Sequence, residues 1–229
     1  MTAASPVARP RALLSWSSGK DCAYALDHVR RAREVEVVGL VTTINSKHGR
    51  VAMHAVTLEL LELQADAVGL PLWLVPIPWP CPNEQYEAAM RNVLDRATLD
   101  GVTHMIFGDL FLEDIRAYRE QQLAGTGIVP LFPVWTAATA ELATQMLASG
   151  LRARVACVDP TRLDAGLAGR EYDSAFLAGL PAGVDPCGEN GEFHTFAYAG
   201  GAFAQALELR CAGTVERDGF VFADLRPGT

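Results

Sequence analysis

The stretch that decides the fold is Ala12-Leu13-Leu14-Ser15-Trp16-Ser17-Ser18-Gly19-Lys20-Asp21-Cys22. It joins a short apolar run to a polar loop, and Ala23, Leu26 and Val29 then follow at helical spacing. This order predicts a strand, a tight loop and a helix. Because such a loop directs backbone N–H groups and the positive end of the helix dipole at the space beyond the strand, the expected occupant of that space is an anion.

The residue types in this loop suit a nucleotide phosphate. Gly19 permits close approach of the backbone, Lys20 supplies a positive charge, and Asp21 is a candidate ligand for Mg²⁺. We expect Lys20 and Asp21 to take part in catalysis as well as in binding. The loop lacks the spacing of a Walker A motif and of the dinucleotide fingerprint, and a capped helix start is the structural alternative. The candidate nucleotide-binding residues here are Ser15, Ser17, Ser18, Gly19, Lys20, Asp21 and Cys22.

Short apolar runs and helical stretches alternate through the first half of the chain. The runs are too apolar for half-exposed strands, and the stretches between them carry one apolar stripe each. The pattern predicts a parallel α/β fold with helices on both faces of the sheet. The expected strands are residues 12–16, 35–43, 70–76, 102–108 and 152–158. The expected stripes are Val56, Leu60, Leu63 and Ala67, and Tyr86, Met90, Val93 and Ala97.

The second half of the chain has a different character. After Gly179 the sequence becomes rich in Gly and Pro, and an Asp218-Gly219 pair between alternating stretches predicts a β-hairpin. We therefore expect residues 1–135 to form a nucleotide-type α/β unit and residues 136–229 to form a smaller α+β unit packed beside it. The boundary stays open at this point, because the run at 152–158 could extend the main sheet.

Composition limits the classes of partner. The 229 residues carry 19 Lys and Arg against 27 Asp and Glu, and a formal net charge of −8 disfavours a nucleic-acid partner. The five cysteines form no C-x-x-C pair that would indicate zinc or a redox dithiol. No apolar run approaches the roughly 20 residues of a membrane span, and the first residues do not read as a signal sequence. We expect a cytoplasmic protein with no membrane partner.

The segment at residues 108–120 is rich in side chains that can do chemistry. It follows an expected strand and places Gly108 and Asp109 at the carboxyl end of that strand, where parallel sheets bind ligands. A helix that continues from there carries three charged residues on one face, which makes them substrate-binding candidates. A salt-bridged surface helix is the alternative. The three residues are Glu113, Arg116 and Glu120.

A second such segment, residues 188–196, reads Gly-Glu-Asn-Gly-Glu-Phe-His-Thr-Phe. Its glycines bracket Glu189 and Asn190, which permits a sharp turn of the backbone. If the segment is extended, Glu192 and His194 project on the same side, and either is a candidate general base. We expect Glu189 and Glu192 to serve an acceptor or a metal more than fold stability. A plain loop that leads into a strand is the alternative.

The loop at residues 17–22 resembles the S-G-G-K-D-S loop of the PP-loop ATP pyrophosphatases, which bind ATP on a five-stranded parallel sheet and release pyrophosphate. Ser18 stands where that family has glycine, and Cys22 stands where it has serine. Together with the segments at 108–120, 131–135 and 188–196, the chain resembles the diphthine–ammonia ligase-like family of these proteins, also described as adenine nucleotide alpha hydrolase-like. The likeness spans nearly the whole chain.

The resemblance implies roles for further residues. In this family a G-E-x-G-E-x-x-T motif faces the ATP cleft and receives the substrate. The eukaryotic and archaeal ligases have an acidic residue near the position of His194, so this sequence resembles the bacterial branch more closely. Thr42 and Thr43 end the second expected strand, near where the adenine or ribose lies in PP-loop folds. His54 follows that strand and its loop, so it is a further nucleotide-binding candidate, with a helix cap as the alternative. The substrate-binding candidates around the motif are Glu189, Asn190, Gly191, Glu192 and Thr195.

These observations predict an AMP-forming, ATP-dependent ligase with ATP and Mg²⁺ as cofactors. It would adenylate a small-molecule or protein-borne carboxylate and transfer it to ammonia or an amine. Two alternatives stay open: a PP-loop RNA-modifying enzyme, and a nucleotide-binding regulatory protein without turnover. The oligomeric state is also open, with a homodimer among the options.

Overall fold

Two β-sheets form the framework of the molecule. The computed structural model describes residues 8–46, 50–51, 56–136 and 138–228. The first sheet has five parallel strands in the order β4–β2–β1–β5–β6, and the short β3 is added antiparallel to β2. The predicted five-stranded parallel α/β sheet is therefore confirmed. The strands are β1 (Arg11–Ser15), β2 (Glu36–Asn45), β3 (Arg50–Val51), β4 (Leu72–Ile77), β5 (Val102–Ile106) and β6 (Val129–Leu131).

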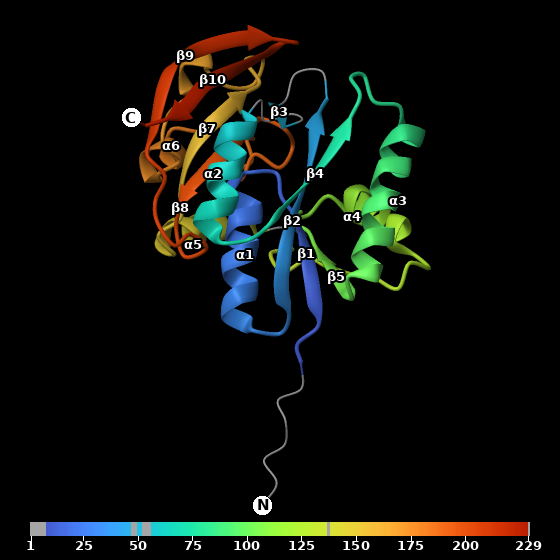
Figure 1. The fold of residues 1–229 in the computed structure, drawn as a ribbon. Coiled ribbons are helices and arrows are strands. Elements are labelled where there is room, and N and C mark those ends of the chain that lie inside the picture. Colours follow the sequence, from blue (N-terminus) through green and yellow to red (C-terminus); the bar gives the residue numbers. More distant parts are fainter. Residues whose placement is uncertain (1–7, 47–49, 52–55, 137, 229) are drawn as a thin grey trace, which may run out of the picture.

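Helices cover both faces of the parallel sheet. Helices α1 and α2 lie on one face, and α3 and α4 lie on the other (Figure 1). The predicted apolar stripes account for most of this packing, because α2 buries Leu60 and Ala67 and α3 buries Val93 and Ala97. Leu63, which was also predicted to lie on the α2 stripe, is 36% exposed. The helices are α1 (Lys20–Ala32), α2 (Leu58–Val68), α3 (Asn83–Leu99) and α4 (Glu113–Leu123).

The fifth parallel strand is not among the five strands predicted from apolar runs. It is β6, which has three residues, includes Pro130 and leaves Val129 half exposed. A short edge strand that contains proline gives a weak apolar signal. The run at residues 152–158 does form a strand, β7 (Arg152–Val158), but it pairs with strands of the second sheet. The alternative in which this run extends the main sheet is thereby excluded.

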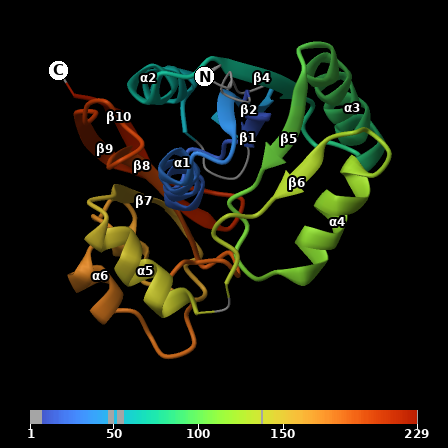
Figure 2. The same cartoon turned by 90° about the horizontal axis from the view of Figure 1, so that it is seen from below.

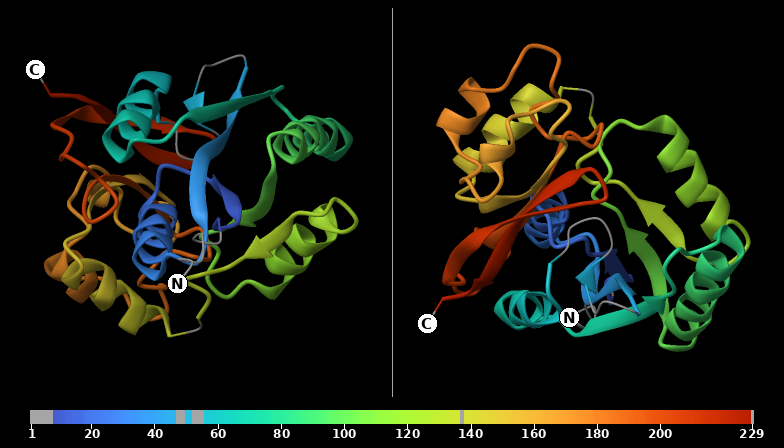
Figure 3. Two further views of the ribbon diagram at one scale, coloured as in Figure 1. Left: turned by 60° about the horizontal axis from the view of Figure 1, so that its bottom comes forward. Right: turned by 90° about the horizontal axis from the view of Figure 1, so that it is seen from above.

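The second sheet is antiparallel, in the order β8–β7–β10–β9. Asp218 and Gly219 connect β9 and β10 with positive φ angles of 52° and 81°, which confirms the predicted hairpin. The hairpin lies on the α2 side of the molecule, away from α3 and α4 (Figure 3). The remaining elements are β8 (Phe193–Ala199), β9 (Leu209–Arg217), β10 (Phe220–Pro227), α5 (Thr139–Ala148), the 3-10 turn η1 (Ala165–Leu167) and α6 (Ser174–Ala178).

Helix α1 lies between the two sheets (Figure 2). One continuous apolar core includes Leu14 of β1, Leu26 of α1 and Phe196 of β8. The Ala197 N–H donates a 2.9 Å hydrogen bond to the Ser18 carbonyl oxygen, which joins β8 to the loop before α1. Segments from opposite ends of the chain therefore meet at the carboxyl end of β1. No helix in the described part of the chain is long and apolar enough to cross a membrane.

Candidate active site

One pocket gathers the three segments that the sequence marked for chemistry. It has a volume of about 220 Å³ and opens beyond the carboxyl ends of β1 and β5. The phosphate loop forms one wall, the end of β5 with α4 forms another, and the segment before β8 forms the third. The lining residues are Ser15, Ser17, Lys20, Asp21, Cys22, Phe107, Gly108, Asp109, Arg119, Cys187, Gly188, Glu189, Phe193, His194 and Thr195.

Ser18 gives the phosphate loop its shape. Its φ angle is 70°, in the left-handed region that residues other than glycine seldom adopt, and the residue is fully buried. Its carbonyl oxygen accepts hydrogen bonds from the Gln64 side chain and from the Ala197 backbone. Ser18 thus adopts the conformation that would suit the glycine usually found there, and neighbouring elements hold it in place. Its Oγ atom is buried and has no hydrogen-bond partner among the described residues.

Lys20 is buried at the first position of α1, with a side-chain exposure of 2%. Its Nζ donates to Asp21 Oδ2 at 2.9 Å and to the Cys187 carbonyl oxygen, and it lies 5.5 Å from the ring centroids of Tyr172 and Phe193. Burial lowers the pKa of Lys20, but Asp21 and the other negative groups nearby outweigh it and hold the pKa above its usual value. A fixed positive charge therefore stands at the phosphate loop.

Asp21 has a free carboxylate oxygen at the same place. While Oδ2 accepts from Lys20, Oδ1 is buried and has no hydrogen-bond partner among the described residues. Burial raises the pKa of Asp21, and Lys20 opposes that shift. The described residues contain no group of three or more His, Cys, Asp or Glu that could hold a metal ion. Mg²⁺ commonly binds one or two carboxylates together with substrate phosphates, so this single carboxylate fits a nucleotide-bound Mg²⁺.

Gly108 lets the end of β5 approach the phosphate loop. A Cβ atom at this position would lie 2.9 Å from the Cys22 backbone nitrogen, so a larger residue would push the two segments apart. Asp109 follows at the pocket wall and pairs with Arg119 of α4, with 3.5 Å between Oδ2 and Nε. The Arg119 guanidinium lies 5.0 Å from the Phe107 ring centroid. Residues 107–109 and α4 together form a charged second wall.

Glu189 joins two walls of the pocket, the segment before β8 and the end of β5. Its Oε1 accepts a 2.9 Å hydrogen bond from the Leu110 N–H just after β5, and its own N–H donates to Asp185 Oδ2. Burial raises the pKa of Glu189 to about 7, with Asp21 and Asp109 adding to the shift. A carboxyl group of this kind can exchange a proton near neutral pH. Its neighbour Gly188 has a φ angle of 69° and permits the turn that aims it.

Glu192 does not line the pocket. It is fully buried, and its Oε1 accepts hydrogen bonds from the Asp185 N–H and from Asn190 Nδ2 and lies 3.3 Å from Arg162. Burial would raise the pKa of Glu192, but these hydrogen bonds and the Arg162 charge hold it below its usual value. Glu192 thus closes the turn that Gly191 permits with a φ of 81°. Asn190 serves the same turn.

His194 and Thr195 reach the pocket from β8. The Thr195 Oγ1 accepts a 3.1 Å hydrogen bond from the Lys20 N–H, so β8 caps the start of α1. Burial, together with the Lys20 charge, lowers the pKa of His194 to about 4. The imidazole is therefore neutral at pH 7 and is a weak base. Among the residues of the second segment, Glu189 has the pKa best suited to proton transfer.

Several predicted residues lie elsewhere. The Thr42 hydroxyl is buried and donates to the Trp16 carbonyl oxygen at 2.7 Å, which joins β2 to β1, and Thr43 does not line the pocket. The salt-bridged alternative describes α4 well, since Arg116 pairs with Glu120 at 2.9 Å. None of Glu113, Arg116 and Glu120 lines the pocket. His54 lies outside the described residues.

Cys22 and Cys187 line the pocket as neutral thiols. Burial raises the pKa of Cys22 to about 11 and that of Cys187 to about 12. The Cys22 thiol donates to the Gly19 carbonyl oxygen, so it occupies the serine position of the loop without becoming a thiolate at neutral pH.

Sequence reasoning missed residues whose role depends on packing. Arg119 is one helical turn from Arg116, and no sequence pattern separates the two. Gln64 had a signal, because it interrupts the apolar face of α2 one turn after Leu60. No sequence pattern marked Tyr172. It lies under the Lys20 ammonium and donates to the Pro186 carbonyl oxygen.

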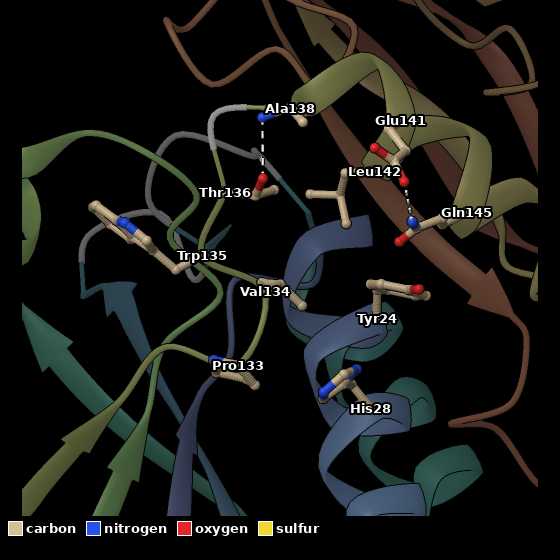
Figure 4. Close-up of a pocket in the computed structure, with 10 residues that line it drawn as sticks. All are labelled: Tyr24, His28, Pro133, Val134, Trp135, Thr136, Ala138, Glu141, Leu142 and Gln145. Atoms are coloured by element: carbon tan, nitrogen blue, oxygen red, sulfur yellow. Dashed lines mark hydrogen bonds between the residues drawn. The ribbon is translucent and has the colours of Figure 1, made fainter.

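A second pocket of about 220 Å³ lies between α1, the β6–α5 connection and α5 (Figure 4). Tyr24 and His28 face it from α1, and Gln145 Nε2 donates to Glu141 Oε1 on α5. Of the predicted nucleotide- and substrate-binding residues that the structure describes, none lines it. The first pocket is therefore the candidate active site.

A five-stranded parallel sheet with a short lysine- and aspartate-bearing phosphate loop after β1 defines a PP-loop nucleotide-binding protein. Comparison with protein-family models matches residues 10–128, more than half of the chain, to the diphthamide synthase N-terminal domain. The chain belongs to this family, within the PP-loop ATP pyrophosphatase superfamily of ATP-using, adenine nucleotide alpha hydrolase-like enzymes. The resemblance found in the sequence is thereby confirmed over residues 10–128. A search of curated proteins gave no match.

Proposed function

We propose that the chain is an AMP-forming, ATP-dependent ligase that adenylates a carboxylate and transfers it to ammonia or an amine, in the manner of a diphthine–ammonia ligase. One observation carries the proposal: Glu189, whose pKa is near 7, faces the same pocket as Lys20 and Asp21. A nucleotide-binding regulatory protein needs the phosphate loop but has no use for a proton acceptor beside it. A ligase needs both.

The chemistry explains why ATP would be required. A carboxylate does not react with ammonia at neutral pH, because oxide is a very poor leaving group. When the carboxylate oxygen attacks the α-phosphorus, an acyl-adenylate forms and pyrophosphate leaves. The amine nitrogen then attacks the acyl carbon, and AMP leaves with the electrons of the C–O bond. ATP cleavage thus replaces a poor leaving group with a good one.

The phosphate loop would supply the electrostatic part of catalysis. Lys20 is held in one place by Asp21 and the Cys187 carbonyl oxygen, so little reorganisation is needed when negative charge develops on departing pyrophosphate. The Asp21 Oδ1 atom is the candidate ligand for a Mg²⁺ ion that would arrive with ATP and neutralise phosphate charge. Backbone N–H groups in the first turn of α1 would orient the phosphates.

Glu189 would accept the proton that the amine loses as the C–N bond forms. A base with a pKa near 7 is ionised in half of the molecules at neutral pH and still binds a proton well. His194, with a pKa of about 4, is a weaker base, and Glu192 does not reach the pocket. We therefore assign the base role to Glu189 and a turn-closing role to Glu192.

The products of ATP breakdown test this proposal. Purified protein is incubated with ATP, Mg²⁺, ammonium and a panel of carboxylic acids, including a diphthine peptide, and the nucleotide products are separated by chromatography. The expected result is AMP and pyrophosphate in amounts that rise with the correct acid. With an ¹⁸O-labelled acid, label should appear in AMP. ADP with labelled orthophosphate would indicate an acyl-phosphate route and contradict the proposal, and ATP binding without acid-stimulated AMP would favour the regulatory alternative.

A further inference from the structure

The pocket contains a second cation that the proposed function has not used. Among the described residues, Lys20 and Arg119 are the Lys and Arg side chains that line it. They stand on different walls, because Lys20 begins α1 at the end of β1 whereas Arg119 belongs to α4, which follows β5. Cleavage between the α- and β-phosphates gives two anionic products, AMP and pyrophosphate. A pocket with two separate cations can hold both.

The surroundings of Arg119 orient it for binding an oxyanion. Its Nε donates to Asp109 Oδ2 at 3.5 Å, and its guanidinium lies over the Phe107 ring. A guanidinium has five N–H donors. The contacts with Asp109 and with the Tyr86 side chain leave further N–H groups for a ligand. These contacts hold the side chain, which is 25% exposed and lines the pocket. A planar, immobilised guanidinium suits the paired oxygens of a phosphate.

Lys20 lies on a different wall of the pocket, at the phosphate loop. Asp21, the Cys187 carbonyl oxygen and two aromatic rings surround its Nζ, next to the loop that holds the leaving phosphates in the proposed reaction. We propose that Arg119 binds the α-phosphate of the nucleotide and remains on AMP, while Lys20 binds the β- and γ-phosphates that leave as pyrophosphate. This assignment rests on the proposed ATP chemistry and adds a residue to it.

A structural role for Arg119 must be separated from ligand binding. Arg119 could act by neutralising Asp109, since an unpaired Asp109 carboxylate at the pocket wall would repel any anion. The two roles predict different results for Asp109→Asn combined with Arg119→Ala. If Arg119 only neutralises Asp109, this double variant binds nucleotide as well as the parent. If Arg119 contacts the α-phosphate, the double variant stays weak.

The experiment measures AMP, pyrophosphate and ATP affinities by calorimetry in the presence of Mg²⁺. We expect Arg119→Ala to weaken AMP binding about tenfold or more, as loss of a charge-assisted pair does, and to change pyrophosphate binding less than about twofold. Lys20→Ala should show the reverse order. Arg119→Lys, which keeps the charge but loses the planar donor pair, should give an intermediate loss for AMP and covers the case in which Arg119→Ala fails to fold.

Arg116→Ala is the matched control. Arg116 lies one turn before Arg119 on α4, pairs with Glu120 and does not line the pocket, so its removal should leave all three affinities unchanged. Parent-like AMP binding by Arg119→Ala or Arg119→Lys, or full recovery in the double variant, would overturn the assignment while ATP binding itself stands. Absence of ATP binding by the parent protein would instead contradict the proposed function, and this inference with it.

Discussion

The Gln64 side chain donates a 3.0 Å hydrogen bond from Nε2 to the carbonyl oxygen of Ser18, and this contact holds the phosphate loop against α2. Gln64 is fully buried, its Oε1 accepts from Trp16 Nε1, and its Nε2 also donates to the Ala197 carbonyl oxygen. One amide therefore connects β1, the phosphate loop and β8. Since Ser18 adopts a left-handed conformation, these hydrogen bonds offset the strain that the loop carries.

Replacement of Gln64 by Leu should destabilise the fold and the loop together. The change leaves the Trp16 N–H without its partner and removes the amide donor shared by two carbonyl oxygens. Each buried group that loses its partner costs about 1–3 kcal/mol. Urea unfolding should show a lower free energy of unfolding, and calorimetry should show weaker ATP binding. Gln145→Leu is the control, because that amide is exposed and donates to Glu141 of its own helix. An unchanged midpoint for Gln64→Leu would contradict this account.

Ser18→Gly should stabilise the protein. Glycine adopts a φ of 70° without the steric cost, about 1–2 kcal/mol, that other residues have in the left-handed region. The change also removes a buried Oγ that lacks a partner in the described structure. Thermal unfolding should give a higher Tm with ATP affinity retained. Ser149→Gly, at a right-handed position, should lower the Tm. A lower Tm for Ser18→Gly would show that the hydroxyl contributes an interaction that the geometry does not reveal.

Lys20→Ala should weaken ATP binding about tenfold or more, because a buried ammonium that faces phosphate makes charge-assisted contacts. The variant also leaves the Asp21 carboxylate uncompensated, which adds repulsion of the ligand. Arg31→Ala serves as the control, since Arg31 lies on the same helix but pairs with Asp27 away from the pocket. Equal ATP affinity in Lys20→Ala and the parent would show that the phosphate loop is not the nucleotide site.

The pH dependence of turnover should report the ionisation of Glu189. Burial raises its pKa to about 7, and a general base works only when ionised, so turnover should fall as the pH decreases through 7. Glu189→Gln should have low turnover without this acid limb. The same raised pKa has the opposite effect on stability. Because the folded state favours the protonated carboxyl group, the contribution of Glu189 to the free energy of unfolding decreases as the pH rises from 4.5 to 7. A parent profile that is flat between pH 6 and 8 would rule out this assignment.

The sequence predicted what depends on local chemistry. Neighbouring residues determine the order of strand, loop and helix around Gly19 and the hairpin at Asp218, and the structure contains both. The apolar stripes of α2 and α3 are also present, except that Leu63 is exposed. The choice between Arg116 and Arg119 depends on how α4 is placed against β5, which no local pattern contains. The β6 strand is too short and too exposed to leave an apolar run.

The second segment shows the same limit in more detail. An extended backbone would place Glu192 and His194 on one side, but β8 begins at Phe193, and the turn before it directs Glu192 into the protein and Glu189 into the pocket. The position of a strand boundary therefore decides which carboxylate can meet a ligand. Residue types alone indicate that this segment could bind a ligand, but they do not show which of its carboxylates faces the pocket.

Glu192→Gln should reduce stability, in contrast to the expectation from sequence that Glu192 serves a ligand more than the fold. Gln cannot reproduce the ionic interaction with Arg162. Its N–H₂ group would replace the buried Oε2 atom, which has no hydrogen-bond partner among the described residues, so its donors would lack an acceptor. The free energy of unfolding should therefore fall by about 1–3 kcal/mol at pH 7. Because the pKa of Glu192 is held below its usual value, its contribution is present above pH 4.5 and disappears as the pH falls through the lowered pKa. Urea unfolding of parent and variant at pH 7 and at progressively lower pH should therefore show a difference that shrinks with acidity. Glu141→Gln, an exposed change on α5, should show no difference at either end. Should Glu192→Gln retain full stability and lose turnover, Glu192 would belong to the reaction and the base role of Glu189 would have to be shared.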